Sequence, residues 1–284
     1  MMRIGYHLKY TSERGHTVDF HPESGFNIYD STGFTATPIN IISSQAFDLV
    51  GTNADAHTVE SKDVVINGEI IGYTKMLRKQ LLDAFTAGVK GTLSYNDEWH
   101  LTVYPIMTPI IDQQVYNGKF QLMLRAPYPY WVSAEDNFTA MSGLFARFKF
   151  PWNFANTHRF GERVRKGAVN VMNTGNVPSR FSIIFRAVFP VVNPKVINLE
   201  TEEFIQINFS MQQGDTIIVN ATVSPPTVTL IRGTERTDIF GSLDIDSTLF
   251  PLQHGDNILA DRASSGEESL ETTILSQIAY TGAW

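Results

Sequence analysis

Seven histidines and three pairs of neighbouring carboxylates are the side chains through which this sequence could carry out acid–base or metal chemistry. The histidines are scattered, and only His16 and His21 lie close together. They are five positions apart in a predicted loop, whereas two metal ligands on one helix face are four apart. The 284 residues include no cysteine, which excludes thiolate nucleophiles, disulfides and cysteine-bound zinc. The sequence therefore predicts no metal site.

The carboxylate pairs are Glu202/Glu203, Asp244/Asp246 and Glu267/Glu268. A glycosidase needs two carboxyl groups facing each other across a cleft, and adjacency in the sequence does not provide this geometry. Ser247, which follows the second pair, favours loop hydrogen bonding instead. The glycine-rich nucleotide-binding motifs, the nucleophile elbow and the zinc-protease motif are absent from the sequence. We therefore nominate no catalytic, cofactor-binding or metal-binding residue, and we expect a protein that is not an enzyme and has no cofactor.

The most unusual local chemistry lies in a basic and aromatic arm at residues 145–170. Six cations face a single carboxylate, Glu162, and are interleaved with aromatic side chains. The cations are Arg147, Lys149, Arg159, Arg163, Arg165 and Lys166, and the aromatic residues are Phe145, Phe148, Phe150, Trp152, Phe154 and Phe160. Such a stretch can stack on and neutralise single-stranded nucleic acid. The alternative is a β-ribbon whose cations meet an acidic protein surface. Because the chain as a whole is acidic, we favour a protein partner and expect no sequence-specific nucleic-acid binding.

The composition indicates a folded, soluble protein. The net charge is −7, 43% of the residues are hydrophobic and only 18% are charged, which excludes a disordered chain. No apolar run approaches the roughly 18 residues that are needed to cross a bilayer. The first residues carry charge and tyrosine where a signal peptide has an apolar core. We expect a chain that folds in the cytosol and has no membrane partner.

The elements that position these residues are mostly strands. β-Branched and aromatic residues form short alternating runs between Gly, Pro, Asn and Asp, which is typical of an antiparallel β protein. The predicted strands are 64–71, 91–95, 98–104, 119–126, 180–188, 204–209, 216–220 and 228–232, with a last strand over 272–280. Asn96-Asp97 predicts a hairpin turn. Asn67-Gly68 predicts either a second hairpin or a bulge within one strand.

One stretch, residues 74–87, is predicted to be a helix. Leu77, Leu81, Ala84 and Phe85 have the spacing i, i+4, i+7 and i+8 and so form one apolar stripe. Gly88 suits the left-handed conformation that often follows a helix. We expect the helix to lie across a sheet and to bury this stripe.

The chain is predicted to have two domains and a mainly β fold. Pro127 and Pro129 end a strand, and a polar stretch follows at 133–137. We therefore expect an N-terminal β domain with one α-helix (α+β) over 1–134 and a C-terminal β domain over 135–284 that carries the arm. From residue 169 onward, short strands and regularly spaced turns are typical of a β-sandwich.

Several segments also occur in an order that is familiar from one protein family. They are the helix and hairpin at 74–95, the strand and Pro-Tyr-Trp end at 120–131, the aromatic stretch at 148–152 with Phe160-Gly161, the segment 169–178, and the turns at 193–198, 213–217 and 247–257. Their order and approximate spacing over about residues 64–257 resemble the distal tail protein (Dit) family of long-tailed phages, also described as the siphovirus tail-component family.

This resemblance implies a structural virion protein of the distal tail, or baseplate. In the family, the N-terminal domain closes into a hexameric ring and a galectin-like sandwich lies at the outside of the ring. The partners that it implies are further copies in a homo-oligomeric ring, the major tail tube protein and the tail tip or hub protein, with a receptor-binding protein as a further candidate. The ring joins tube to tip and anchors the host-adsorption apparatus. The implied location is the distal end of the tail, after assembly in the host cytoplasm.

Two other functions stay open on the sequence. Galectin-like sandwiches bind sugars through aromatic platforms, and Trp152 or Trp284 can supply one, so a lectin-like module for cell-wall saccharides is the main alternative. A glycoside hydrolase ranks below it, because Asp244/Asp246 is the one acid pair that we can nominate.

Overall fold

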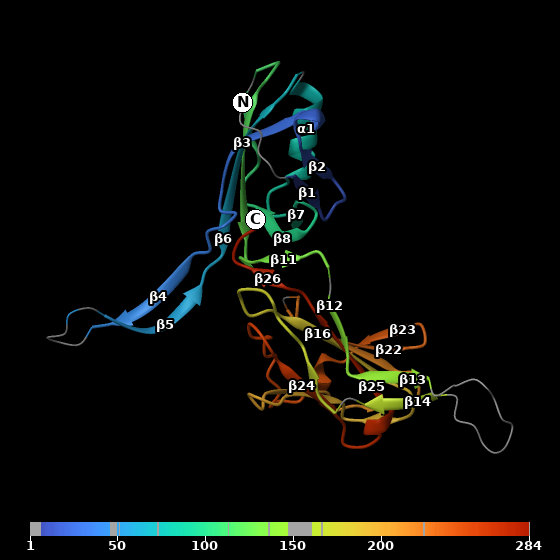
Figure 1. Cartoon of the computed structure of the whole chain (residues 1–284). Helices are drawn as coiled ribbons and strands as arrows, with labels where there is room; N and C mark the ends of the chain where they lie inside the picture. The colour runs from blue at the N-terminus through green and yellow to red at the C-terminus, as the bar shows by residue number, and fades with distance from the viewer. Residues whose placement is uncertain are drawn as a thin grey trace. The chain divides into compact units, whose positions relative to one another are not determined.

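The computed structural model describes residues 7–45, 50, 52–72, 74–112, 114–135, 137–146, 161–165, 167–223 and 225–283. The chain forms two compact units, which Figure 1 shows together: unit 1 is residues 1–135 with 279–284, and unit 2 is residues 136–278. The last six residues thus return to unit 1, whereas the sequence analysis assigned all of 135–284 to a C-terminal domain. No helix in the described ranges is long and apolar enough to span a membrane.

Unit 1 is built on an antiparallel sheet whose main path runs β2-β1-β7-β8-β10-β6-β3, with β9, β11 and β26 attached. The bounds of these strands are β1 (Leu8–Ser12), β2 (Thr17–Phe20), β3 (Phe26–Thr32), β6 (Lys62–Ile70), β7 (Gly91–Tyr95), β8 (Trp99–Pro105), β9 (Ile110–Ile111), β10 (Lys119–Ala126), β11 (Trp131–Ser133) and β26 (Ala279–Tyr280). A 3-10 turn, η1 (Pro22–Ser24), links β2 to β3. The predicted strands 91–95 and 119–126 are confirmed with their bounds.

The two predicted turns have different outcomes. Asn96 and Asp97 both have positive φ, 53° and 56°, and close the β7–β8 hairpin as expected. Of the two alternatives at Asn67-Gly68, the hairpin is wrong and the single strand is confirmed, because β6 runs through both residues and pairs with β10 without a break. The irregularity lies in the partner strand β3, between Ile28 and Asp30, opposite these two residues. Gly68 serves a different purpose there. A Cβ at this position would lie 2.3 Å from the Phe120 ring, so the glycine makes room for an aromatic side chain.

The predicted helix is present as α1 (Thr74–Ala84). Of the expected stripe, Leu81, Ala84 and Phe85, which directly follows α1, are buried, and Leu77 is partly buried against the same core. The helix ends three residues earlier than predicted. The chain leaves the helix because the N–H of Gly88 donates to the carbonyl of Pro105 at 2.9 Å, and Gly88 adopts the left-handed conformation with a φ of 76°. Phe85 stacks on Tyr10 of β1 with a centroid distance of 4.0 Å, which fixes α1 against the sheet.

A second hairpin, β4 (Ile39–Ser44) with β5 (Asn53–Val59), forms a two-stranded sheet of its own between β3 and β6. In Figure 1 these two blue strands extend away from the rest of unit 1. Every residue of both strands is exposed.

The end of the chain completes the core of unit 1. β26 pairs with β11, and Ala283 is buried in the same cluster as Trp131. The buried ammonium of Lys62 donates to the carbonyl of Thr281 at 2.6 Å, and the hydroxyl of Thr37 donates to the same oxygen at 3.0 Å. Residues separated by more than 200 positions in the sequence thus share one buried polar site.

Unit 2 is a β-sandwich around a separate core, in which side chains of both sheets take part. The six-stranded sheet has the order β12 (Asn137–Ala140), β25 (Leu270–Ser276), β16 (Phe181–Ala187), β21 (Thr216–Asn220), β22 (Thr227–Arg232) and β23 (Glu235–Asp238). The four-stranded sheet has the order β15 (Val169–Asn170), β24 (Ile258–Arg262), β18 (Lys195–Asn198) and β19 (Phe204–Gln206). Smaller elements are β13 (Ser142–Ala146), β14 (Gly161–Arg165), β17 (Val191–Val192), β20 (Ser210–Met211), η2 (Phe240–Ser242) and η3 (Glu267–Ser269).

The mainly β fold with a helix in the first half and a sandwich in the second is as predicted. The last predicted strand, 272–280, is divided into β25 and β26, because the chain passes from unit 2 to unit 1 between them. The predicted strand 216–220 is confirmed as β21, whereas β19 is half the predicted length.

Replacing Leu81 by aspartate tests the packing of α1. Leu81 is fully buried, so Leu81→Asp places an unpaired charge in the core of unit 1 and should cost several kcal/mol of unfolding free energy, about 3 or more. The neighbouring Leu82 is exposed, and Leu82→Asp is the matched control, with an expected change within about 0.5 kcal/mol. Urea unfolding of the purified chain measures both. Equal stability of the two variants would mean that α1 does not pack as described.

The pH dependence of stability tests the buried amine. Burial lowers the pKa of Lys62 to about 8. Between this value and the unfolded value near 10.5, the unfolded chain binds more protons, so the contribution of Lys62 to the unfolding free energy rises with pH, by at most about 1.4 kcal/mol per unit. We expect the stability difference between wild type and Lys62→Met to move in favour of wild type from pH 8 to pH 10. A difference that is independent of pH over this range would contradict the burial of the amine.

Candidate functional site

The two histidines that lie close in sequence do not come together. His16 and His21 stand at opposite ends of β2, not in one loop as predicted. His21 caps η1, where its Nδ1 accepts from the N–H of Glu23 at 3.3 Å. Within the described residues, no group of three or more His, Asp or Glu side chains is arranged to hold a metal ion.

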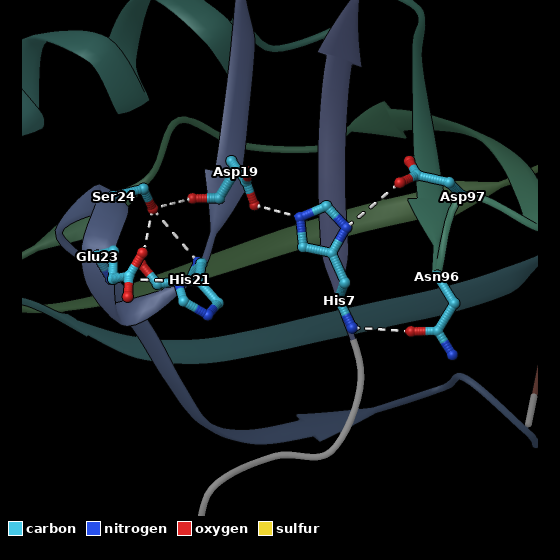
Figure 2. A network of polar contacts seen from close by, with 7 residues as sticks. All are labelled: His7, Asp19, His21, Glu23, Ser24, Asn96 and Asp97. Atoms are coloured by element: carbon cyan, nitrogen blue, oxygen red, sulfur yellow. Dashed lines mark hydrogen bonds and ion pairs between the residues drawn. The ribbon is translucent and has the colours of Figure 1, made fainter.

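A different histidine forms the centre of a polar network, which Figure 2 shows. His7 Nε2 lies 2.7 Å from Asp19 Oδ1, and His7 Nδ1 lies 3.6 Å from Asp97 Oδ2. The N–H of His7 donates to Asn96 Oδ1 at 2.8 Å. The carbonyl of Asp19 accepts from the hydroxyl of Ser24. The network connects the start of β1 with β2 and with the β7–β8 turn, so we interpret its role as stabilising the fold of unit 1.

A serine and a histidine are also in contact, which sequence reasoning missed. Ser94 Oγ lies 3.0 Å from His100 Nδ1, on directly paired positions of β7 and β8. Burial lowers the pKa of His100, against a smaller opposite effect of Asp97. Ser94 is also paired with β1 and His100 with β11, so both residues lie within the sheet. The contact joins strands and does not present a nucleophile at a sheet edge.

The three carboxylate pairs lie in turns. Asp244 Oδ2 accepts from Asn208 at 2.8 Å, and Asp244 Oδ1 accepts from the N–H of Asp246 at 3.0 Å. These hydrogen bonds, that of Asn208 first, hold the pKa of Asp244 below its usual value. Both oxygens are thus used to fix the turn after η2, as Ser247 led us to expect.

The other two pairs are also local. Glu202 is in the left-handed conformation, with a φ of 61°, and Glu203 accepts from the hydroxyl of Thr201 at 2.9 Å. Glu267 and Glu268 form the first turn of η3. None of these described contacts sets two carboxyl groups across a cleft.

Two of the segments that carry the family resemblance, 169–178 and 247–257, are joined by side-chain hydrogen bonds in unit 2. Asn173 Nδ2 donates to the carbonyls of Val177 and Leu252, both at 3.0 Å. Asn257 Nδ2 donates to the carbonyl of Gly255 at 3.1 Å and to that of Val171 at 3.2 Å. These hydrogen bonds therefore connect turns that are about 80 positions apart in the sequence, and both asparagines are buried.

The basic and aromatic arm is described only at its base. β13 and β14 pair as an antiparallel ribbon, with Phe145 opposite Glu162. Residues 147–160 and Lys166 lie outside the described residues, as do the side chains of Arg163 and Arg165. The predicted sugar-platform residues Trp152 and Trp284 also lie outside the described residues.

The ion pair between Arg232 and the buried Asp215 allows the contribution of a buried carboxylate to the stability of unit 2 to be tested. Arg232 binds Asp215 with two hydrogen bonds of 2.8 and 2.6 Å, and the Asp215 carboxylate is buried. The Arg232 guanidinium, with a hydrogen bond from the N–H of Gln212, holds the pKa of Asp215 below its usual value. Asp215→Asn should therefore cost about 1–3 kcal/mol at pH 7. The cost should shrink as the pH falls below about 4, because wild type loses the same interaction there.

Asp63 is the matched control for this variant. It makes the same two-bond contact with Arg125, but both side chains are half exposed. Asp63→Asn should cost less than about 1 kcal/mol. Chemical unfolding at pH 7 and pH 3 gives both values, and equal costs for the two variants at pH 7 would contradict the assigned burial.

The comparisons with known proteins agree with the resemblance seen in the sequence. Residues 174–284 match the family model described as the C-terminal domain of the siphovirus-type tail component. No curated protein matches the chain.

Three of the solved structures that resemble the chain are a phage Dit protein and two phage baseplates. The crystal structure of the Dit protein of phage SPP1, described as a paradigm of the hub adsorption apparatus in phages that infect Gram-positive bacteria, matches with a TM-score of 0.67 and 12% identity. The match covers 96% of this chain and 98% of the SPP1 chain. Two structures of the phage p2 baseplate in its activated conformation match as well. The one with calcium has a TM-score of 0.56 and 11% identity and covers 99% of this chain and 100% of that chain. The one with strontium has a TM-score of 0.57 and 11% identity, and the match covers 98% of this chain and 99% of that chain. The resemblance to the distal tail proteins of phages is therefore confirmed, by the family model in residues 174–284 and by the fold across nearly the whole chain.

Proposed function

We propose that this chain is a structural component of the distal end of a phage tail. In this proposal, copies of unit 1 form a ring, expected to be hexameric, that joins the tail tube protein to the tip or hub protein. Unit 2 anchors the host-adsorption apparatus, including a receptor-binding protein. The observation that carries the proposal is the likeness of the fold to SPP1 Dit over 96% of the chain, together with the tail-component match in unit 2.

The edges of the sheets support the assignment of ring formation to unit 1. β3 pairs only with β6 among the described strands. It contains neither lysine nor proline and only one charged residue, Asp30, which follows a register shift in its pairing with β6. Natural sheets usually protect such an edge with charge or proline. The outer strand β23 of unit 2 is protected in this way, since its four residues are all exposed and include Glu235, Arg236 and Asp238. Unit 1 therefore offers an edge that a neighbouring copy can pair with.

The proposed activity is assembly by surface complementarity, without catalysis. The carboxylates that could act as acids or bases fix turns instead, as in Asp244, and the described histidines contact neighbouring strands, as His100 does, or turns, as His21 does. A lectin-like role stays an alternative, because its two candidate tryptophans lie outside the described residues. Specific binding of purified chain to host cell-wall saccharides would favour that alternative.

Mass determination in solution, combined with negative-stain imaging, tests the proposal. The purified full chain, alone or mixed with its hub protein, should form rings of about six times the 31.8 kDa mass of one copy. Labelled antibody against the chain should mark the far end of the tail in intact particles. A chain that stays monomeric under both conditions, or that is found elsewhere in the particle, would refute the proposal.

A further inference from the structure

The β4–β5 hairpin has no hydrophobic cover of its own. All thirteen strand residues are exposed, and four of them are large apolar side chains, Ile39, Ile41, Ile42 and Val59. An isolated two-stranded hairpin is marginally stable at best in water. Some other surface must therefore cover this hairpin when it functions.

The register of the hairpin places its apolar residues mainly on one face. Ile39 is opposite Val59, and Ile41 is opposite His57, and these four residues share one side of the ribbon. The segment from 33 to 61 contains no lysine or arginine, whereas Asp55 and Glu60 are acidic and exposed. The hairpin is thus an apolar and acidic surface without the lysines that usually prevent association of free strands.

Unit 1 carries a second exposed apolar surface, which we call the α1 tip. It consists of Ile71, Met76, Ile110, Val115 and Tyr116, all exposed. Hydrogen bonds hold its parts together, because the N–H of Gly72 donates to Asn117 Oδ1 at 2.9 Å and Arg78 Nη2 donates to the carbonyl of Asp112 at 2.6 Å. The adjoining face of α1 exposes Lys75, whereas Lys79, which is also exposed, forms an ion pair with Asp83 one turn further along the helix.

We propose that the β4–β5 hairpin of one copy docks on the α1 tip of the next copy. This inference rests on the proposed ring. The two surfaces are both apolar, the hairpin is acidic whereas Lys75 adjoins the α1 tip, and they are different surfaces of the same chain. A ring built from head-to-tail contacts needs such a pair of unlike, complementary surfaces on every copy.

The size of the hairpin fits this role. A stable interface takes roughly 20–30 residues from each side. About half of the thirteen exposed strand residues lie on the apolar face and supply roughly a quarter of one side, and the open edge of β3, from which the hairpin emerges, can supply more. A second copy is favoured over the tube or hub protein as the occupant, because every copy carries both surfaces and both are exposed among the described residues of a single copy.

Lysine substitutions on exposed isoleucines test the docking. Ile41 on the hairpin is 60% exposed, and Ile245 in unit 2 is 96% exposed, so neither Ile41→Lys nor Ile245→Lys should lower the thermal midpoint of the monomer. We expect Ile41→Lys to abolish ring formation in sedimentation and negative-stain experiments and Ile245→Lys to retain it. Rings that form normally with Ile41→Lys would overturn the docking but leave the proposed function intact. A wild-type chain that never forms rings would overturn both.

Cross-linking identifies the occupant, because the natural chain has no cysteine. A variant with both Ile41→Cys and Met76→Cys should give a ladder of covalently joined copies under oxidising conditions, and neither single variant should. A ladder from Ile41→Cys alone would mean that two hairpins face each other. A cross-link formed only with added tube or hub protein that carries a surface cysteine would give the hairpin a different partner. Either of these results would overturn the proposal.

A charge exchange tests the orientation independently. Asp55→Lys and Lys75→Glu should each weaken association at least about tenfold, and the two together should restore most of it. Additive weakening in the double variant would contradict the pairing of the hairpin with the α1 tip.

Discussion

The architecture of unit 1 depends on a group of aromatic rings packed between α1 and the sheet. Tyr10 stacks on Phe85, and Phe120 is within about 6 Å of both Phe20 and Phe26, measured between ring centroids. Two of these rings occupy space that only glycine leaves open. A Cβ at Gly91 would lie 2.3 Å from the hydroxyl oxygen of Tyr10, and Gly68 stands in the same relation to Phe120. Because the rings fix the position of α1, they also determine which side chains of the helix face outward, and hence the surface available to a partner.

The sequence predicted best where the signal is local. The alternation in β7, β10 and β21 and the spacing of Leu81, Ala84 and Phe85 in α1 depend only on neighbours along the chain. The hairpin predicted at Asn67-Gly68 is wrong because a distant residue determines the local structure. The composition of this pair suits a turn, but the glycine is needed to make room for the ring of Phe120, more than 50 positions away. The return of residues 279–284 to unit 1 likewise depends on residues that are distant in the sequence, because it requires pairing with Trp131 and a hydrogen bond from the buried Lys62.

The chemistry of the candidate residues follows a similar pattern. Asp244 and Asp246 form a close pair in sequence, but the turn aligns the backbone of one with the carboxylate of the other. The Ser94–His100 contact was missed because cross-strand register brings the two residues together, and register requires knowledge of the pairing. The turns that carry the family resemblance were recognisable because asparagine and glycine at fixed offsets satisfy strict local geometry, as Asn173 and Asn257 show. Core strands accept many apolar residues. Two chains can therefore share a fold at 11–12% sequence identity while such turns can still be recognised in the sequence.

The exposed β4–β5 hairpin connects folding with assembly. Its strands gain ladder hydrogen bonds but bury almost no apolar surface, so in a single copy little opposes the conformational entropy that favours fraying. Contact with another copy would bury Ile39, Ile41 and Val59 and would thereby also order the ribbon. Part of the binding free energy is then used to order the hairpin, which weakens isolated contacts. In the proposed ring, closure would compensate for this, because every hairpin would be covered at once and no end would be left open. This coupling favours complete rings over partial ones.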